Sequence, residues 1–409
     1  MRKLSALFSF AALALFVQLA AAQTLGGTPR QPAEVPGGYF ASLNSTPQHR
    51  AQNRLSAATN LATQAQSQNI ISIPTFSSSF TSDGQSYAYT MVGQNPALRR
   101  TTSVPTDYVP LSFYFDEFVD QNGNNITIDA TTVTHEIRNS PLFDDAEYAS
   151  GDTQFVDAQM RAQFWPLINT RRGDNYHVLL GTPQTLTPVT IEVPYGASQM
   201  FVDPTGTYFA LIDVNFIESQ LNTMLQLEPV DVRSIPIFLT RNAVYGDFSM
   251  GEPVDCCVGG FHTAYEARQT GNRTYVQTVV FATSLDADVA NTVFGDPGEF
   301  ADINALSHEL AETVNDPFAN NVTPSYQVPG APQGVCQNTL EVGDITESFI
   351  PDYTDVTLHG FTYHPQTLGV LQWFEDATPS TAINGDFSFP DSSLLTTQFT
   401  ACAAIVPVG

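Results

Sequence analysis

Residues 307–317 read Ser-His-Glu-Leu-Ala-Glu-Thr-Val-Asn-Asp-Pro, and this stretch decides how the second half of the chain is interpreted. His308 and Glu312 are four residues apart, so on a helix their side chains leave the same face, about 40° apart. The pattern predicts an amphipathic helix from about Asp302 to Asn315, which Pro317 ends. The apolar stripe on the opposite face consists of Ile303, Leu306, Leu310 and Val314.

An imidazole and a carboxylate on one helix face can bind a divalent metal ion together. The layout resembles the zinc-peptidase helix His-Glu-x-x-His, with Glu312 in place of the second histidine. Such a site needs about three protein ligands and one open position for water. The third ligand stays open among several residues. We favour Asp344 or Glu341, because Gly343 permits a tight turn toward the helix; the alternatives are Asp316, His359 and His364.

Glu309 follows the histidine directly, where His-Glu-x-x-His enzymes carry the general base that activates water. We therefore predict Glu309 as the catalytic residue and one divalent metal as the cofactor. Zinc is favoured by the motif. Manganese or calcium are possible, because one imidazole with two carboxylates is a harder and more anionic ligand set than two imidazoles with one carboxylate.

The wider sequence resembles the plant phosphate-induced (Exordium-like) family and related exported bacterial proteins. The likeness covers about residues 105–350. It is carried by residues 307–317 and by Glu-Val-Gly-Asp at 341–344, with support from Cys-Val-Gly-Gly-Phe-His at 257–262 and from residues 151–157. The resemblance implies site positions at His308, Glu309, Glu312, Glu341 and Asp344. It implies no particular reaction, so the peptidase interpretation depends on the zinc-peptidase (zincin) likeness of the helix.

The chain begins Met-Arg-Lys and then runs apolar from Leu4 to Ala22, a pattern typical of a secretory signal peptide over residues 1–22. We expect a secreted protein, extracellular or periplasmic. No later apolar run reaches the roughly 18 residues of a spanning helix, so no membrane insertion is expected. The formal net charge of −26 argues against a nucleic-acid partner, whose phosphates would repel the chain.

Four cysteines in an exported chain indicate disulfides. Adjacent cysteines rarely bond each other, so we expect Cys256 and Cys257 to pair separately with Cys336 and Cys402. His262 follows the first two cysteines in a Gly-rich turn. We interpret it as a loop residue; the functional alternatives are a residue that supports a metal ligand and a substrate contact.

The fold class expected is α+β, with a zincin-like mixed sheet packed on the metal-site helix, a β-rich N-terminal part and a loop-rich C-terminal part. The order that suggests it is a helix over 213–227, a strand over 234–240, an irregular edge segment, a strand over 275–281 and the motif helix. The expected divisions are a low-complexity arm over 23–72, a β-rich part over 73–229 and a zincin-like part over 230–409, with one continuous domain over 73–409 as the alternative.

These observations support an exported metal-dependent hydrolase, a peptidase acting on a polypeptide or other extracellular substrate. The alternative is a non-catalytic extracellular protein, of the cell-wall or matrix type, with a structural cation site. A third hypothesis is a secreted binding domain without metal. A metal site requires a carboxylate or imidazole from outside the helix within about 5 Å of both His308 and Glu312.

Overall fold

The computed structural model describes residues 28–34, 73–169, 175–227, 230–254, 256–269, 273–327, 336–371, 373, 387–397 and 399–402. Within these residues the fold is α+β with strands predominating, which confirms the predicted class at that level. The signal peptide over 1–22 and most of the arm over 23–72 lie outside the described residues. Among the helices described, none has the length and apolar character needed to cross a membrane.

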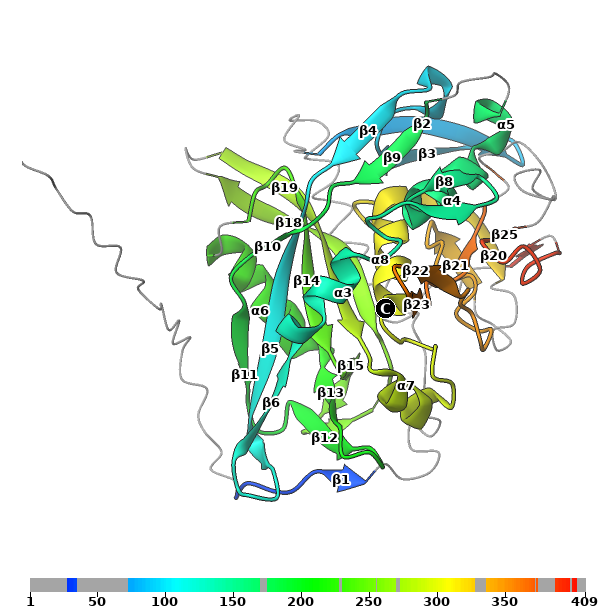
Figure 1. The fold of residues 1–409 in the computed structure, drawn as a ribbon. Helices are drawn as coiled ribbons and strands as arrows, with labels where there is room; N and C mark the ends of the chain where they lie inside the picture. Colours follow the sequence, from blue (N-terminus) through cyan, green and yellow to red (C-terminus); the bar gives the residue numbers. More distant parts are fainter. Residues whose placement is uncertain are drawn as a thin grey trace, which may run out of the picture.

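A seven-stranded sheet forms the centre of the molecule (Figure 1). Its strand order is β10-β5-β14-β19-β18, and β6 and β11 also pair with β5. Strands β5, β14 and β19 run parallel to one another, whereas β18 at the edge is antiparallel to β19. The boundary expected near residue 230 therefore runs through one sheet, since β5 precedes it and β14 follows it. The bounds are β5 Thr106–Val119, β6 Asn125–Asp129, β10 Gln184–Thr185, β11 Val189–Val193, β14 Ile235–Arg241, β18 Gly260–Gln269 and β19 Arg273–Ser284.

The sheet is buried on both faces because its side chains alternate between two apolar clusters. On β14, Ile237 and Leu239 join the cluster that contains the motif helix, whereas Phe238 joins the cluster that contains helix α6 (Val214–Leu227). On β19, Val280 and Phe281 separate in the same way. The result is a layered arrangement with α6 on one face and the motif helix on the other.

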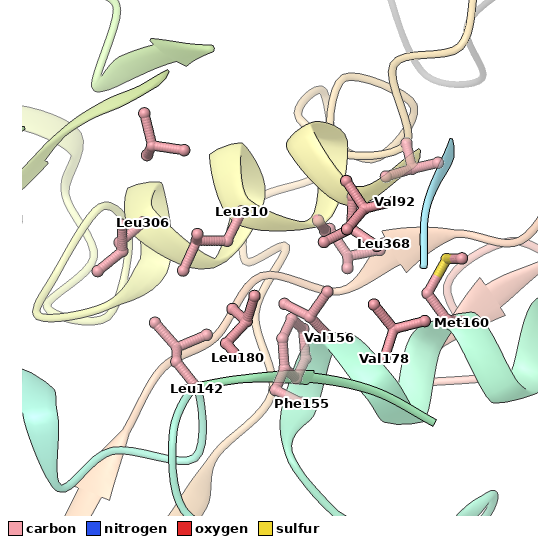
Figure 2. Close-up of a cluster of buried hydrophobic side chains, with 14 of the residues drawn as sticks. Val92, Leu142, Phe155, Val156, Met160, Val178, Leu180, Leu306, Leu310 and Leu368 are labelled. Atoms are coloured by element: carbon pink, nitrogen blue, oxygen red, sulfur yellow. The ribbon is translucent and has the colours of Figure 1, made fainter. Parts of the chain in front are cut away.

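The motif helix α8 spans Asn304–Asn315, close to the predicted 302–315. Its apolar stripe is fully buried, as expected, against helix α4 (Phe155–Gln163) and neighbouring strands. Figure 2 shows Leu306 and Leu310 of α8 facing Phe155 and other apolar side chains. The polar face is buried as well, since every residue of α8 is buried except His308, which is partly exposed. The chain beyond residue 320 covers that face.

A smaller four-stranded sheet, in the order β1-β12-β13-β15, lies beside the central one. Strand β1 (Ala33–Glu34) belongs to the stretch expected to be an arm, yet it pairs in parallel with β12 (Ser198–Val202). Helix α7 (Ala287–Phe294), which the sequence analysis did not predict, packs its buried residues against β13 (Tyr208–Asp213) and β15 (Ala243–Gly246). Part of the expected arm is therefore an integral strand.

After α8, the described residues form mainly loops and short strands, as predicted. The strands of this C-terminal part are β20 Val322–Gln327, β21 Cys336–Thr339, β22 Val356–Leu358, β23 Phe361–Tyr363, β24 Leu368–Gly369, β25 Ser388–Phe389 and β26 Thr400–Ala401. The remaining elements are β2 Thr75–Ser82, β3 Gln85–Val92, β4 Thr101–Val104, α3 Thr134–Arg138, β7 Ala146–Tyr148, β8 Gly151–Thr153, α5 Trp165–Ile168, β9 His177–Leu180, β16 Phe248–Ser249 and β17 Glu252–Pro253, with 3-10 turns at Pro96–Leu98 and Ala130–Thr132.

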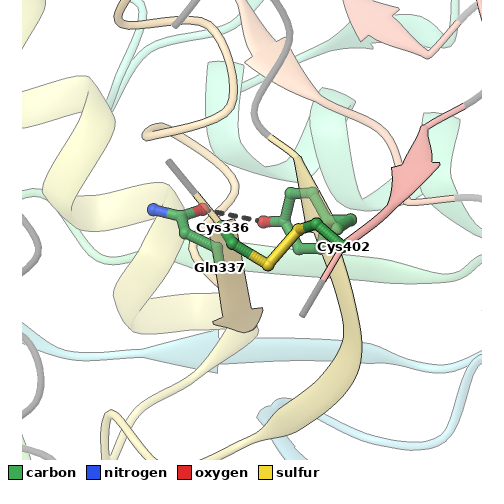
Figure 3. The surroundings of a disulfide bond; sticks show 4 residues. Cys336, Gln337 and Cys402 are labelled. Carbon is green, nitrogen blue, oxygen red and sulfur yellow. Dashed lines mark hydrogen bonds between the residues drawn. A yellow bond between two sulfur atoms is a disulfide. The ribbon is translucent and has the colours of Figure 1, made fainter. Parts of the chain in front are cut away.

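All four cysteines form disulfides, but the expected pairing is wrong. Cys256 bonds its neighbour Cys257, across a Cα–Cα distance of 3.1 Å, and Cys336 bonds Cys402. The second bond links the beginning and the end of the C-terminal part, because Cys336 starts β21, Cys402 follows β26, and both strands flank β20 in one small sheet (Figure 3). The first cysteine pair lies at the start of β18 and so does not reach the segments that follow α8.

Candidate metal centre

His308 projects from the polar face of α8 with its ring orientation set by Gln366. The Gln366 amide donates to the Gly343 carbonyl at 3.0 Å, so its oxygen is free to accept from His308 Nδ1, 2.6 Å away. The proton is then on Nδ1, and the Nε2 lone pair faces two carboxylates. Nε2 lies 3.1 Å from Glu312 Oε2 and 3.5 Å from Asp344 Oδ1.

His262 enters the same site from the edge strand β18. Its Nε2 donates to the backbone carbonyl of Asp316 at 3.1 Å, which leaves the Nδ1 lone pair to face the helix. Nδ1 lies 3.3 Å from Glu312 Oε2 and 3.5 Å from Glu309 Oε2. In their neutral forms, both imidazoles would therefore present an unprotonated nitrogen to carboxylate oxygen, which is the arrangement a metal ligand requires.

Glu312 is the residue on which the two histidines converge. Its Oε1 accepts hydrogen bonds from the backbone N–H groups of Gly343 at 3.0 Å and Asp344 at 3.3 Å. Its Oε2 makes the two imidazole contacts. The loop after β21 thus holds one oxygen of Glu312 and aims the other at the site.

Two groups of side chains in the described residues place three ligand atoms within 4.8 Å of one another. The first, cluster A, is His308, Glu312 and Asp344; the second, cluster B, is His262, Glu309 and Glu312. Asp344 thus meets the requirement, set from the sequence, of a ligand from outside the helix near both His308 and Glu312.

Two glycines let the surrounding backbone approach these ligands closely. A Cβ on Gly343 would lie 2.5 Å from Cγ and Nδ1 of His308, and one on Gly260 would lie 2.8 Å from Cγ of Glu309. Gly343 has no left-handed φ angle. It is therefore needed for close approach to the imidazole and not for the tight turn that the sequence analysis assumed.

Asp344 is positioned by a chain of hydrogen bonds that reaches the Cys336–Cys402 disulfide. Gln337, the residue after Cys336, donates from Nε2 to Asp344 Oδ2 at 2.5 Å and accepts from Tyr326 Oη at 2.9 Å. Figure 3 shows Gln337 beside the disulfide, with the tyrosine bond dashed. The covalent closure of this small sheet thus supports one of the cluster A ligands.

The site is buried and strongly acidic. It borders a cavity of about 130 Å³ whose lining includes two histidines but, among the described residues, no lysine or arginine. The same lining includes Cys257 and Phe300. Six carboxylates line it: Glu309, Glu312, Glu341, Asp344, Glu347 and Asp352. Buried negative charge of this density needs protons or cations to offset it.

The pKa values shift accordingly. Burial raises the pKa of Asp344 and of Glu341, and the charge of Glu312 adds to both shifts. Burial alone would lower the pKa of His308, but Glu312 and Glu309 outweigh it and hold that pKa well above the usual range. Burial alone would raise the pKa of Glu312, but the charges of His308 and His262 outweigh it and lower that pKa. Asp344, Glu341 and His308 therefore each hold a proton more tightly than they would in water. A metal ion would compete with those protons.

The other predicted ligands lie differently. Glu341 is buried and its Oε2 lies 3.9 Å from His262 Nε2, but it belongs to neither cluster. Asp316 accepts backbone N–H bonds on both carboxylate oxygens, from Asn320 at 2.9 Å and Asn321 at 2.8 Å, and so shapes the turn that ends α8. His364 bonds Asp302 at 2.5 Å and the exposed His359 bonds Asp144 at 3.0 Å. Neither of these two histidines belongs to the clusters.

His262 is the residue that the sequence analysis placed most inaccurately. It is not in a turn but on β18, paired opposite Val280 and 7% exposed. A signal was available: Gly260 and His262 alternate with Phe261, so a strand would put both on the face toward α8. Gln366 and Gln337, which orient the ligands, had no sequence signal.

No protein-family model matches the chain, and neither a curated protein nor a solved structure matches it. The function is therefore argued from the chemistry of the site.

Proposed function

We propose that this protein is an exported metal-dependent hydrolase, a peptidase of the zincin type, with a divalent cation held by His308, Glu312 and Asp344. The observation that carries the proposal is the convergence of His308 Nε2, Glu312 Oε2 and Asp344 Oδ1, with the imidazole proton directed away by Gln366. A nitrogen lone pair facing two carboxylate oxygens is repulsive unless a proton or a cation lies between them.

The distances are compatible with a cation. Elsewhere in the described residues, His177 lies 2.7 Å from Asp157, His364 lies 2.5 Å from Asp302 and the exposed His359 lies 3.0 Å from Asp144. His308 Nε2 is 3.1 and 3.5 Å from its two carboxylates. Two ligands at about 2.1 Å from one ion are separated by about 3.0 Å at a right angle and about 3.4 Å at a tetrahedral angle.

The order of elements also supports the zincin interpretation. Helix α6, strand β14, edge strand β18, strand β19 and helix α8 occur in the expected order, with β15, β16 and β17 between β14 and β18 and helix α7 between β19 and α8. The edge strand is antiparallel, and both β18 and β19 pack on α8. The motif helix thus lies on a mixed sheet, the setting in which that family places its metal.

Glu309 is the proposed general base. The residue is 5% exposed and its Oε2 has no hydrogen-bond partner, so that oxygen is available to a substrate or a water molecule. Burial raises its pKa, which brings the carboxylate closer to the basicity that proton transfer near neutral pH requires. A bound cation supplies Lewis acidity at the scissile carbonyl. Glu309 takes a proton from the attacking water and returns it to the leaving amine.

A structural cation site is the second candidate, and the size of the cavity is the observation that favours it. About 130 Å³ is below the ~300–1,000 Å³ typical of ligand pockets. A polypeptide could present only a small group to this space in the described conformation. The same ligands would then stabilise the fold by binding a cation between α8, the loop after β21 and β18.

The test begins with the metal content of the purified full chain, measured by elemental analysis. We expect bound divalent metal, cleavage of denatured casein, and loss of cleavage after treatment with a chelator. Glu309→Gln should retain the cation of cluster A but lose cleavage. Glu136→Gln is the matched control, because Glu136 is the glutamate of the other His-Glu pair of the chain, on α3, and does not line the cavity.

The outcomes separate the hypotheses. A chain that contains no metal and takes none up overturns the proposal. Cleavage retained in Glu309→Gln removes that residue as the base. Metal without cleavage by the wild type favours the structural cation site.

A further inference from the structure

We infer that the site holds two divalent cations bridged by Glu312. One is bound by cluster A and the second by cluster B, His262, Glu309 and Glu312. The inference rests on the proposed function for the first cation and adds a second metal site with a different ligand set. In that second site Glu309 is a metal ligand, and this role replaces its proposed role as the general base.

The first observation is that one carboxylate oxygen serves both clusters. Glu312 Oε2 lies 3.1 Å from His308 Nε2 and 3.3 Å from His262 Nδ1. Within the described residues, no group that meets the 4.8 Å limit contains both imidazoles. The two nitrogens therefore approach Glu312 Oε2 from different sides, and a single ion would not join them. If two ions share Glu312 Oε2, each ion can be bound by one of the two imidazole nitrogens.

The second observation is the unpartnered oxygen of Glu309. Its side chain is 7% exposed and lines the cavity, and Oε2 is directed at His262 Nδ1 across 3.5 Å without forming a hydrogen bond. A buried carboxylate oxygen without a partner costs about 1–3 kcal/mol or more. A cation between Glu309, Glu312 and His262 would remove that cost.

The contacts of His262 make a direct ion pair a poorer explanation. Its Nε2 already donates to the Asp316 carbonyl, and its Nδ1 is 3.3 and 3.5 Å from two carboxylates. A charged N–H···O bond is normally about 2.7–2.9 Å long, as at His177, and the contact at His364 is shorter still. The separations in cluster B match those in cluster A, and both match the ligand-to-ligand spacing around one ion.

Charge balance is compatible with two cations. Four carboxylates either belong to the clusters or lie within 4 Å of a cluster imidazole: the buried Glu309, Glu312 and Glu341 and the partly exposed Asp344. When ionised they carry a formal charge of −4, which two divalent cations neutralise and one does not. Each cluster offers one imidazole nitrogen and carboxylate oxygens, a set that suits manganese, iron or zinc. Two ions that share a carboxylate lie about 3.5–4 Å apart in known two-metal sites.

The experiment uses the full chain, stripped with a chelator, dialysed and reloaded with Mn²⁺, followed by elemental analysis and electron paramagnetic resonance. We expect two Mn²⁺ per chain with the spectrum of an exchange-coupled pair. His262→Gln and Glu309→Gln should each bind one Mn²⁺ with the six-line spectrum of an isolated ion. His308→Gln tests cluster A in the same way, and Gly181→Ala, remote from the site, should bind two.

Each outcome is decisive. One Mn²⁺ in the wild type, lost in His308→Gln, overturns the second site and leaves the proposed function standing. No Mn²⁺ and no Zn²⁺ in the wild type overturns both. Two magnetically independent ions would place the second cation elsewhere and overturn the bridge. Because the wild-type stoichiometry and spectrum are measured directly, a buried variant that fails to fold does not remove the test.

Discussion

Gly343→Ala is the sharpest perturbation of the centre, because it adds one methyl group beside a proposed ligand and changes no charge. The new Cβ would lie 2.5 Å from Cγ and Nδ1 of His308, where ordinary contacts begin at about 3.4 Å. The ring must move by about 1 Å. Such a shift breaks the 2.6 Å bond between Nδ1 and Gln366 and carries Nε2 away from Glu312 and Asp344.

Loss of an orienting contact typically costs 10- to 100-fold in metal affinity, or about 1.4–2.7 kcal/mol. We expect that loss for Gly343→Ala, measured by competition with a chromogenic chelator. Gly181→Ala is the control, since its Cβ would meet no atom closer than 3.4 Å. The thermal midpoint of both chains with chelator present reports whether the fold is intact. Wild-type affinity in a folded Gly343→Ala chain would refute the assignment of His308 as a ligand.

Three further predictions concern stability. Leu310→Ala should lower the free energy of unfolding by about 2–5 kcal/mol in denaturant titration, because Leu310 is fully buried between α8 and α4; a loss below 1 kcal/mol would contradict that packing. Cys402→Ser removes the disulfide to Cys336, which spans 66 residues, and chain entropy predicts a loss of about 4 kcal/mol in the free energy of unfolding. Metal binding should also weaken, because Gln337, which holds Asp344, is next to Cys336; unchanged metal affinity would disprove that link. Burial raises the pKa of Glu299 from 4.5 to about 9, so stability should fall as pH rises through that window, because the unfolded chain releases this proton first. The slope contributed by Glu299 is at most about 1.4 kcal/mol per pH unit, and Glu299→Gln should flatten the measured profile; an equally steep profile would rule the residue out.

Much of the secondary structure could be predicted from local pattern. The helix over 302–315 agrees with the structure to within two residues. Helix α6 and strand β14 agree equally well. Periodic burial accounts for this agreement, because the apolar residues of each segment lie in one of the two clusters on the faces of the central sheet. The edge strand β18 was missed, since its Gly-Gly-Phe-His start reads as a turn when no partner strand is known.

The disulfide pairing could not be deduced in the same way. The general rule against bonding adjacent cysteines does not hold for Cys256 and Cys257, and the sequence does not order the three pairings that four cysteines allow. Cys336 and Cys402 come together because β21 and β26 both pair with β20. The disulfide pairing therefore follows from the strand pairing in this small sheet and not from the spacing of the cysteines.

The sequence by itself determined the helix, its boundary at Pro317 and the presentation of His308 and Glu312 on one face, because helical periodicity is a local property of the chain. The tertiary structure alone decided what meets that face. Asp344 comes from the loop after β21, His262 from the edge of the sheet, and the orienting Gln366 from 58 residues beyond His308. A metal-binding arrangement is a set of distances between side chains, and those distances follow from how separate segments pack.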